Sequence, residues 1–210
     1  MPTLIILTCV VLLPLLLSLW TSFTPFKLTK PDTLYRFVGF RNYERLIGDL
    51  DFWIAFGRTV LFLAIALNLE LVFGLGIALL INKITYGQRT LRTLMMFPMM
   101  FSPILVGFQW KYIFNDNIGL MNNFLREFGV IQPIPWLVDG ILANISIMAA
   151  EIWSSTSVFA ILLLAGLLGI PKDPIEAAKV DGCNSWQVFK NITLPFLMPF
   201  VFIAMTIRSL

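Results

Sequence analysis

Glu151, Ser154 and Ser155 are the residues most able to bind a solute, because they interrupt an apolar run, MAAEIWSSTS. In a helix, positions three and four apart lie on one face, so the carboxylate and the hydroxyls would form a hydrogen-bonding stripe. A sugar needs such partners, and Trp153 could add a flat apolar surface beside them. On the residues alone, packing against a neighbouring helix is an equally good explanation, because acids and hydroxyls also join helices in membranes.

Glu70 is a second acid inside an apolar run, LNLELVFGLG. An ionised carboxylate at the centre of a membrane helix costs about 2.5–3.5 kcal/mol even on the lenient insertion scale. Such a group must therefore face protein or water. We interpret Glu70 as a packed acid that bonds a neighbouring helix or lies near the membrane interface, and we leave its function open.

The sequence disfavours the usual catalytic and metal chemistry. It contains no histidine, which removes the common general base and most zinc sites. Cys9 lies in an apolar run and Cys183 in a polar segment, so both are expected to be free thiols. The phosphate-binding pattern G-x-x-x-x-G-K-S/T does not occur, so the chain itself should not bind ATP. We predict no catalytic residue, no metal site and no cofactor.

Composition indicates an integral membrane protein. The 210 residues are 58% hydrophobic and 13% charged, with a mean hydropathy of +0.85. Soluble domains carry roughly 45–50% apolar and about 25% charged residues. A formal charge of +3 fits loops beside anionic lipid headgroups better than nucleic-acid binding. Lipid is therefore an expected partner and nucleic acid is not.

The apolar runs predict four complete membrane spans and a fifth that is cut short, since a span needs about 20 apolar residues. The charges of the loops on the two sides are nearly equal, although the short basic link 82–93 favours a cytoplasmic position. We expect an all-α fold, a polytopic transmembrane helical bundle that forms one domain over residues 1–210. The predicted spans are 3–23, 59–81, 94–114, 141–168 and 195–210, the last incomplete.

The polar stretch IPKDPIEAAKVDGCNSWQVFKNITLP, residues 170–195, separates two apolar runs. Asp173 can cap a short helix, and Glu176 can bond back to the cap. Gly182 then offers a left-handed stop, and Ser185 can cap a second helix. These signals predict a helix–turn–helix elbow outside the membrane, where a plain connection would need only about four residues.

The segment EAAKVDGCNSWQVFKNITLP resembles the EAA loop of ABC importer permeases, apart from Cys183, where that family usually has alanine. Other blocks, among them SLWTSFT, FVGFRNYERLI, LRTLMMFPMMFSP and WKYIFNDNIGLMN, resemble the sugar-uptake permeases of the maltose and glycerol-3-phosphate type. They resemble in particular the subunit that carries VGFRNY after its first span. The blocks occur in order through nearly the whole chain.

The resemblance implies a type I ABC importer permease fold with six core spans, so this chain would lack the end of span five and all of span six. It implies a cytoplasmic EAA loop that docks into a cleft of an ATPase subunit. The implied partners are a second permease subunit, two ATP-binding subunits and an extracytoplasmic solute-binding protein, in a bacterial or archaeal cytoplasmic membrane. Leu194 also stands in register with the family pattern, and the implied coupling residues are Glu176, Ala177, Ala178, Asp181, Gly182 and Pro195.

The resemblance also implies a function and a set of substrate-lining residues. The chain would translocate a sugar or sugar-like solute, glycerol phosphate included, by alternating access. Arg208 in the fifth span could pair with Glu151 or with an anionic substrate. The implied lining residues are Met99, Pro103, Glu151, Ser154, Ser155, Val158 and Arg208.

Two other classes of protein fit the sequence less well. A secondary transporter would need inverted repeats and broken helices in both halves, and no repeat is visible. A membrane-embedded enzyme would need clustered acids or histidines at a membrane face, and the sequence has no such cluster. The EAA-like loop argues against both.

Overall fold

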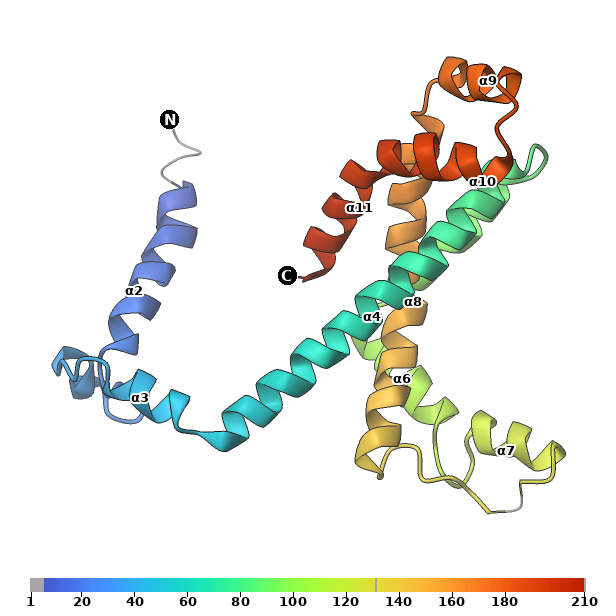
Figure 1. The fold of residues 1–210 in the computed structure, drawn as a ribbon. Helices are drawn as coiled ribbons and strands as arrows, with labels where there is room; N and C mark the ends of the chain where they lie inside the picture. Colours follow the sequence, from blue (N-terminus) through green and yellow to red (C-terminus); the bar gives the residue numbers. More distant parts are fainter. Residues whose placement is uncertain (1–5, 131, 210) are drawn as a thin grey trace. The chain divides into compact units, whose positions relative to one another are not determined.

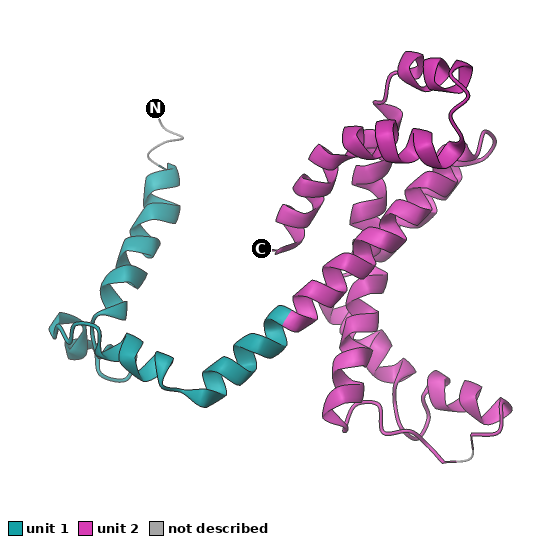
Figure 2. Cartoon of the chain, viewed as in Figure 1, with its two compact units in different colours: residues 1–60 teal, residues 61–210 magenta. Residues whose placement is uncertain are grey.

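The computed structural model describes residues 6–130 and 132–209, and in these residues the fold is helical, as predicted. Within this part of the chain, the β structure is limited to an isolated bridge between Lys27 and Lys30. The contacts group into two compact units, Met1–Val60 and Leu61–Leu210 (Figure 2), and the expected single transmembrane domain stays a prediction. The long helix α4, Leu50–Lys83, contributes residues to both units.

Figure 1 shows the helices coloured along the chain from the N-terminus to the C-terminus. Before α4, the elements are the π turn η1 (Thr8–Leu12), α2 (Leu13–Ser22), the 3-10 turn η2 (Pro31–Tyr35) and α3 (Arg41–Ile47). After α4, they are α5 (Gln88–Met96), the 3-10 turn η3 (Pro98–Met100), α6 (Pro103–Ile113), α7 (Leu120–Glu127), α8 (Gly140–Leu168), α9 (Lys172–Val180), α10 (Ser185–Val188), the π turn η4 (Phe189–Thr193) and α11 (Leu194–Ser209).

In the first unit, the VGFRNY segment folds back onto the end of α2. Asn42 donates its side-chain N–H to the carbonyls of Ser22 and Thr24, each at 2.8 Å. The last carbonyls of a helix have no partner within the helix, so the bond to Ser22 satisfies a group that would otherwise remain open, and the bond to Thr24 extends the contact beyond the helix end. Tyr43 adds a hydroxyl bond of 2.7 Å to the side chain of Ser22. The motif therefore anchors α3 to the end of the first apolar helix.

Three helices of the described residues are long and apolar enough to cross a membrane: α4, α8 and the continuous helix Ser185–Ser209. The predicted spans 59–81 and 141–168 fall within α4 and α8. The predicted span 195–210 falls in the last of these helices, which begins at Ser185 and so includes part of the predicted loop. The predicted span 3–23 corresponds to the shorter apolar helix formed by η1 and α2, and its first residues lie outside the described part of the chain.

The predicted span 94–114 contains a sharp break. Its parts, Gln88–Met100 and Pro103–Ile113, meet at a bend of 89°. Pro103 has no N–H to donate to the preceding turn, and Ser102 before it is extended, with φ −60° and ψ 138°. The sequence located this apolar region but not the break, which lets α6 pack against α8 as a separate helix.

Small residues bring the helices of the second unit close together. The buried face of α4 recurs every fourth residue, at Ala66, Glu70, Gly74 and Ala78. A Cβ atom added to Gly74 would lie 2.4 Å from the Cβ of Phe159 on α8, closer than carbon atoms can approach. The backbones of α4 and α8 are therefore packed at a distance that only glycine permits, as is common between helices in membranes.

The core of this unit lies where α8 meets α4 and α11. Phe159, Leu163 and Leu197 are completely buried there. Gly166 repeats the close approach on the other side of α8, since its added Cβ would lie 2.8 Å from ring atoms of Phe200 on α11. The position of α8 between two helices is thus fixed by a glycine at each contact.

We predict that Gly74→Ala destabilises the protein and that Gly76→Ala does not. The added methyl group at Gly74 must displace Phe159, and such overpacking costs about 1–3 kcal/mol. A Cβ at Gly76 has nothing within 4 Å, so this variant controls for the change of glycine in the same helix. Thermal unfolding of the purified protein measures the difference. Equal midpoints for the two variants would contradict the close packing of α4 on α8.

Candidate functional site

A cavity of about 530 Å³ lies in the second unit, with walls from α6, α8 and α11. Five of the seven predicted lining residues contribute to it. These five are Pro103, Glu151, Ser154, Ser155 and Arg208. The cavity therefore brings together residues from three separate predicted spans.

Met99 and Val158 do not line this cavity. Met99 lies in η3, before the break, so its segment runs at 89° to the helix that forms the cavity wall. Val158 is half-buried on α8, one turn beyond Ser154 and Ser155. The family resemblance that implied both residues as lining residues carries no information about the break or the limits of the wall.

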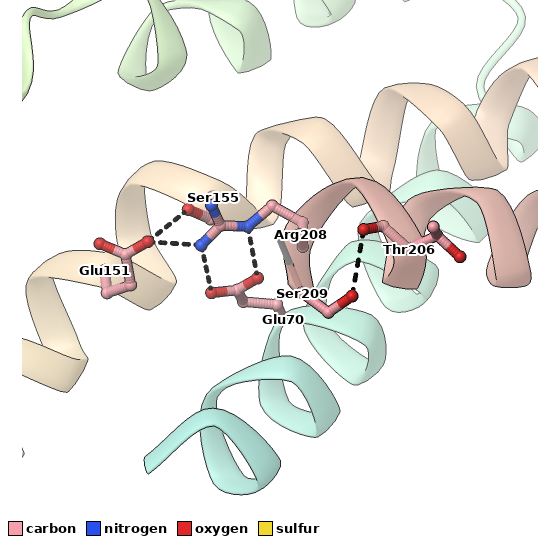
Figure 3. A network of polar contacts seen from close by, with 6 residues as sticks. All are labelled: Glu70, Glu151, Ser155, Thr206, Arg208 and Ser209. Atoms are coloured by element: carbon pink, nitrogen blue, oxygen red, sulfur yellow. Dashed lines mark hydrogen bonds and ion pairs between the residues drawn. The ribbon is translucent and has the colours of Figure 1, made fainter. Parts of the chain in front are cut away.

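The polar wall of the cavity is a bonded group (Figure 3). Ser155 donates its hydroxyl to Oε1 of Glu151 at 3.2 Å, which is the contact that the four-residue spacing predicts. Nη2 of Arg208 on α11 donates to the same carboxylate oxygen. Of the two partners that the sequence left open for Arg208, Glu151 or an anionic substrate, the structure shows the contact with Glu151. Ser154 lines the cavity beside them.

Glu70 is the third member of this group. It is completely buried, and it accepts from Nε of Arg208 at 3.2 Å and from Nη2 at 3.3 Å. The interpretation of Glu70 as a packed acid bonded to a neighbouring helix is confirmed. Sequence reasoning missed its partner, although one signal was available: two opposite charges in apolar segments each avoid a large desolvation penalty by pairing.

Aromatic side chains supply the apolar wall, but not the one that the sequence indicated. Phe101, Trp110 and Phe114 line the cavity, and the rings of Trp110 and Phe114 stack with centroids 5.5 Å apart. Trp153 was expected beside the polar stripe. It lies outside the lining, with its ring 6.3 Å from that of Phe101 and 6.0 Å from that of Trp110. On α8, Trp153 does not share the face of Glu151 and Ser155. It supports the aromatic wall indirectly, through its ring contacts with Phe101 and Trp110.

At the other end of α8, the helix α9 begins earlier than predicted. Asp173 was expected to be the N-cap, but Pro171 takes this position with φ −58° and ψ 144°, and it offers no side-chain cap. Asp173 and Pro174 therefore lie inside the first turn, where proline is tolerated because the first amides lack helical partners. Glu176 lies beyond that turn, so the predicted capping box at Asp173 was wrong.

The end of α9 follows the prediction. Gly182 has φ +80°, the left-handed conformation that glycine adopts without strain. The N–H of Gly182 donates to the carbonyl of Lys179 at 3.1 Å, and the N–H of Cys183 donates to that of Ala178 at 2.9 Å. These two bonds define a Schellman motif, which closes the helix and reverses the chain.

The second helix of the elbow has a different cap from the predicted Ser185. The side chain of Asn184 accepts from the N–H of Gln187 at 2.9 Å, and the side chain of Gln187 accepts from the N–H of Asn184 at 2.8 Å. A reciprocal capping box requires Gln or Glu three residues after the cap. Asn184 has Gln187 at that position, whereas Ser185 has Val188.

This second helix continues past Pro195 into α11 instead of ending there. α10, η4 and α11 form one continuous apolar helix. Pro195 has no N–H to donate, and the wider π turn of η4 ends two residues before it, at Thr193. The elbow is therefore attached directly to the helix that carries Arg208.

Residues 1–210, the whole chain, match the family described as the binding-protein-dependent transport system inner membrane component. The chain belongs to this family.

Proteins similar in sequence to this chain are named as permease proteins of transport systems. The chain is 35% identical over 208 residues to the probable ABC transporter permease protein y4oQ of Sinorhizobium fredii, covering 99% of this chain and 67% of that protein. It is 35% identical over 213 residues to the trehalose/maltose transport system permease protein MalF of Thermococcus litoralis, covering 100% and 70%. It is 29% identical over 211 residues to the trehalose transport system permease protein SugA of Mycobacterium tuberculosis, covering 100% and 66%.

Among solved structures, a bacterial ABC transporter involved in the import of the acidic polysaccharide alginate has the same fold. The TM-score is 0.81 at 22% identity, and the match covers 99% of this chain and 69% of that chain. The inner membrane component described here is therefore a membrane-embedded permease subunit, rather than an enzyme or a secondary transporter.

The elbow of this permease presents an exposed surface. Glu176, Ala177 and Asp181 are exposed, whereas Ala178 is buried. A two-turn helix is unstable alone, so the caps at its end and at the following helix must hold its shape. The surface is thus available to another chain while its backbone remains ordered by local bonds.

We predict that Asn184→Ala loosens the elbow and that Ser185→Ala does not. Loss of an N-cap side chain costs about 0.5–2 kcal/mol, and Ser185 makes no contribution to the cap. Hydrogen exchange of residues 183–189 measures the effect, with Ser185→Ala as the matched control. Greater exchange in Ser185→Ala than in Asn184→Ala would show that Ser185 is the N-cap, as the sequence indicated, and would contradict this prediction.

Proposed function

We propose that this permease subunit translocates a sugar or sugar-like solute and that the cavity between α6, α8 and α11 holds the solute during transport. The observation that carries the proposal is the pairing of an aromatic wall with a polar wall in one cavity. Trp110 and Phe101 form the first, and Glu151, Ser154 and Arg208 form the second. A volume of about 530 Å³ is within the usual range for small-molecule sites, roughly 300–1,000 Å³.

The two walls match the two surfaces of a sugar. A sugar hydroxyl donates one hydrogen bond and accepts others, so it can bond the carboxylate of Glu151 and the hydroxyl of Ser154. The C–H groups of a sugar ring are apolar and pack against aromatic faces such as that of Trp110. Two relatives are named for trehalose or for trehalose and maltose, and these names support the same class of solute.

The partners proposed for the complete importer are an extracytoplasmic binding protein that delivers the solute, a second permease subunit and two ATP-binding subunits. The family name and the alginate transporter, solved with a periplasmic protein bound to an alginate pentasaccharide, support the first of these. ATP hydrolysis belongs to the partner subunits in this proposal, and the permease alternates its access in response.

The elbow of residues 170–194 is the proposed coupling element. Its exposed helix α9 would dock on an ATP-binding subunit, and both of its ends lead into helices that line the cavity. Movement of α9 would therefore act on α8 and on α11. The proposed coupling residues are Glu176, Ala177, Ala178, Asp181, Gly182 and Pro195.

We predict that Ser154→Ala and Glu151→Ala impair uptake, whereas Ser157→Ala does not. Loss of one good hydrogen bond to a bound sugar costs about 1–3 kcal/mol when its partner stays buried, which corresponds to roughly 5- to 150-fold in transport efficiency. Ser157 lies on the same helix outside the cavity and is the control. Uptake of radiolabelled trehalose and maltose by the reconstituted importer is measured. Normal uptake by both cavity variants would show that the polar stripe serves only to pack helices together and does not bind the solute.

We predict that Gly182→Val weakens the stimulation of ATP hydrolysis by the binding protein, whereas Gly182→Asn largely preserves it. A β-branched residue is strained at φ +80°, at a cost of about 1–2 kcal/mol, while Asn tolerates this conformation. A Cβ here has nothing within 4 Å, so the effect acts through the backbone alone. ATPase assays in proteoliposomes test the pair. Full stimulation of ATP hydrolysis in Gly182→Val would show that the shape of the elbow is not needed for coupling.

A further inference from the structure

The two carboxylates bonded to Arg208 differ in their access to the cavity. The side chain of Glu70 is 0% exposed, that of Arg208 26% and that of Glu151 43%. Glu70 uses both oxygens to hold Nε and Nη2 of the guanidinium, and it does not line the cavity. Glu151 uses one oxygen, which it shares with Ser155. Glu70 is thus the fixed partner of Arg208, and Glu151 is the partner that a ligand can reach (Figure 3).

The net formal charge in and around the cavity depends on the buried Glu70. Its charged lining residues are Lys111, Glu151 and Arg208, which together carry +1. Glu70 stands directly behind Arg208 and brings the sum to zero. Because the surroundings are apolar, a charge that is not cancelled at this depth would act strongly on any ligand in the cavity.

We propose that Glu70 is a specificity-determining positioning residue, which holds Arg208 and cancels its charge so that the cavity accepts neutral polyhydroxylated solutes and rejects anionic ones. This inference rests on the proposed function and names the class of solute at the same site. Arg208 remains a hydrogen-bond donor to hydroxyl groups. It is no longer a free counter-ion for a phosphate or a carboxylate, which would also face the negative charge of Glu151.

The alternative class, a phosphorylated solute such as glycerol phosphate, requires a different arrangement of the same residues. An anion that paired with Arg208 would have to separate it from two carboxylates, one of which is fully buried. An anion that paired with Lys111 instead would still enter a cavity that holds the negative charge of Glu151. Removing one partner of a buried pair leaves the other uncompensated, which is strongly unfavourable. The fixed pair therefore discriminates against anions while leaving hydrogen bonding intact.

The test uses the full-length permease in its assembled transporter and compares probes that differ by one charged group. Trehalose, maltose and glycerol are the neutral probes, and trehalose 6-phosphate, maltose 1-phosphate and glycerol 3-phosphate are their anionic counterparts. Protection against thermal unfolding, titrated for each probe in detergent, gives half-saturating concentrations without the selectivity of a binding protein. For the wild type, neutral probes should protect and phosphorylated ones should not.

Glu70→Gln leaves Arg208 uncancelled, so preference should shift toward the phosphorylated probe of each pair by about tenfold or more. Glu70→Asp keeps the charge and should retain the neutral preference. The double variant Glu70→Gln with Arg208→Gln removes both charges, and it should restore the neutral preference with weaker binding. A merely structural role for Glu70 would change stability in these variants but not the order of the probes.

The remaining outcomes also decide the matter. If Glu70→Gln does not assemble, the order of the probes is read from the double variant: a preference for the neutral probes supports the proposal, and equal protection by neutral and phosphorylated probes overturns it, as does failure of both variants to assemble. Unchanged selectivity in an assembled Glu70→Gln variant would overturn this inference and leave the proposed function standing. Absence of protection of the wild type by every neutral probe would overturn both.

Discussion

A charge in the apolar interior of a membrane must be paired, and the second unit of this permease is organised around that constraint. Arg208 is held by Glu70 and Glu151, so α4, α8 and α11 meet at one point. The pairing fixes which face each helix presents. On α4, Gly74 follows Glu70 by four residues and lies on the same buried face, where the helix touches Phe159. The charge contact and the close backbone contact therefore set the same register.

The same helices connect the cavity to the elbow. α8 carries Glu151 in its middle and leads through three residues into α9, while α11 carries Arg208 and is continuous with α10. An ion pair is bonded more rigidly than apolar packing, because its distances and directions are both constrained. In the proposed coupling, a displacement of α9 changes the relative positions of Glu151 and Arg208. In that proposal, the polar wall of the cavity responds to movement of the exposed helix α9.

The features that the sequence predicted depend on local spacing, and those that it missed depend on distant contacts. The bond between Ser155 and Glu151 follows from a four-residue interval, and the left-handed Gly182 follows from a helix that ends. The pairing of Glu70 with Arg208 joins residues 138 positions apart, which no local pattern reports. Trp110 was overlooked because the break at Ser102 sets the direction of α6. The caps were misjudged where a proline or an Asn–Gln pair competed with the expected residue.

Internal pairing also suits a site that must release what it binds. A cavity whose charges wait for an ionic ligand would be costly when empty, because each charge would then lack a partner. Here the charges of Glu70 and Arg208 are satisfied within the chain itself. A neutral solute exchanges hydrogen bonds with water for hydrogen bonds with Glu151 and Ser154, and the net gain per bond is small. On the proposed function, the solute is therefore held by several weak contacts, and the empty cavity can return to its outward-facing state without separating a buried ion pair.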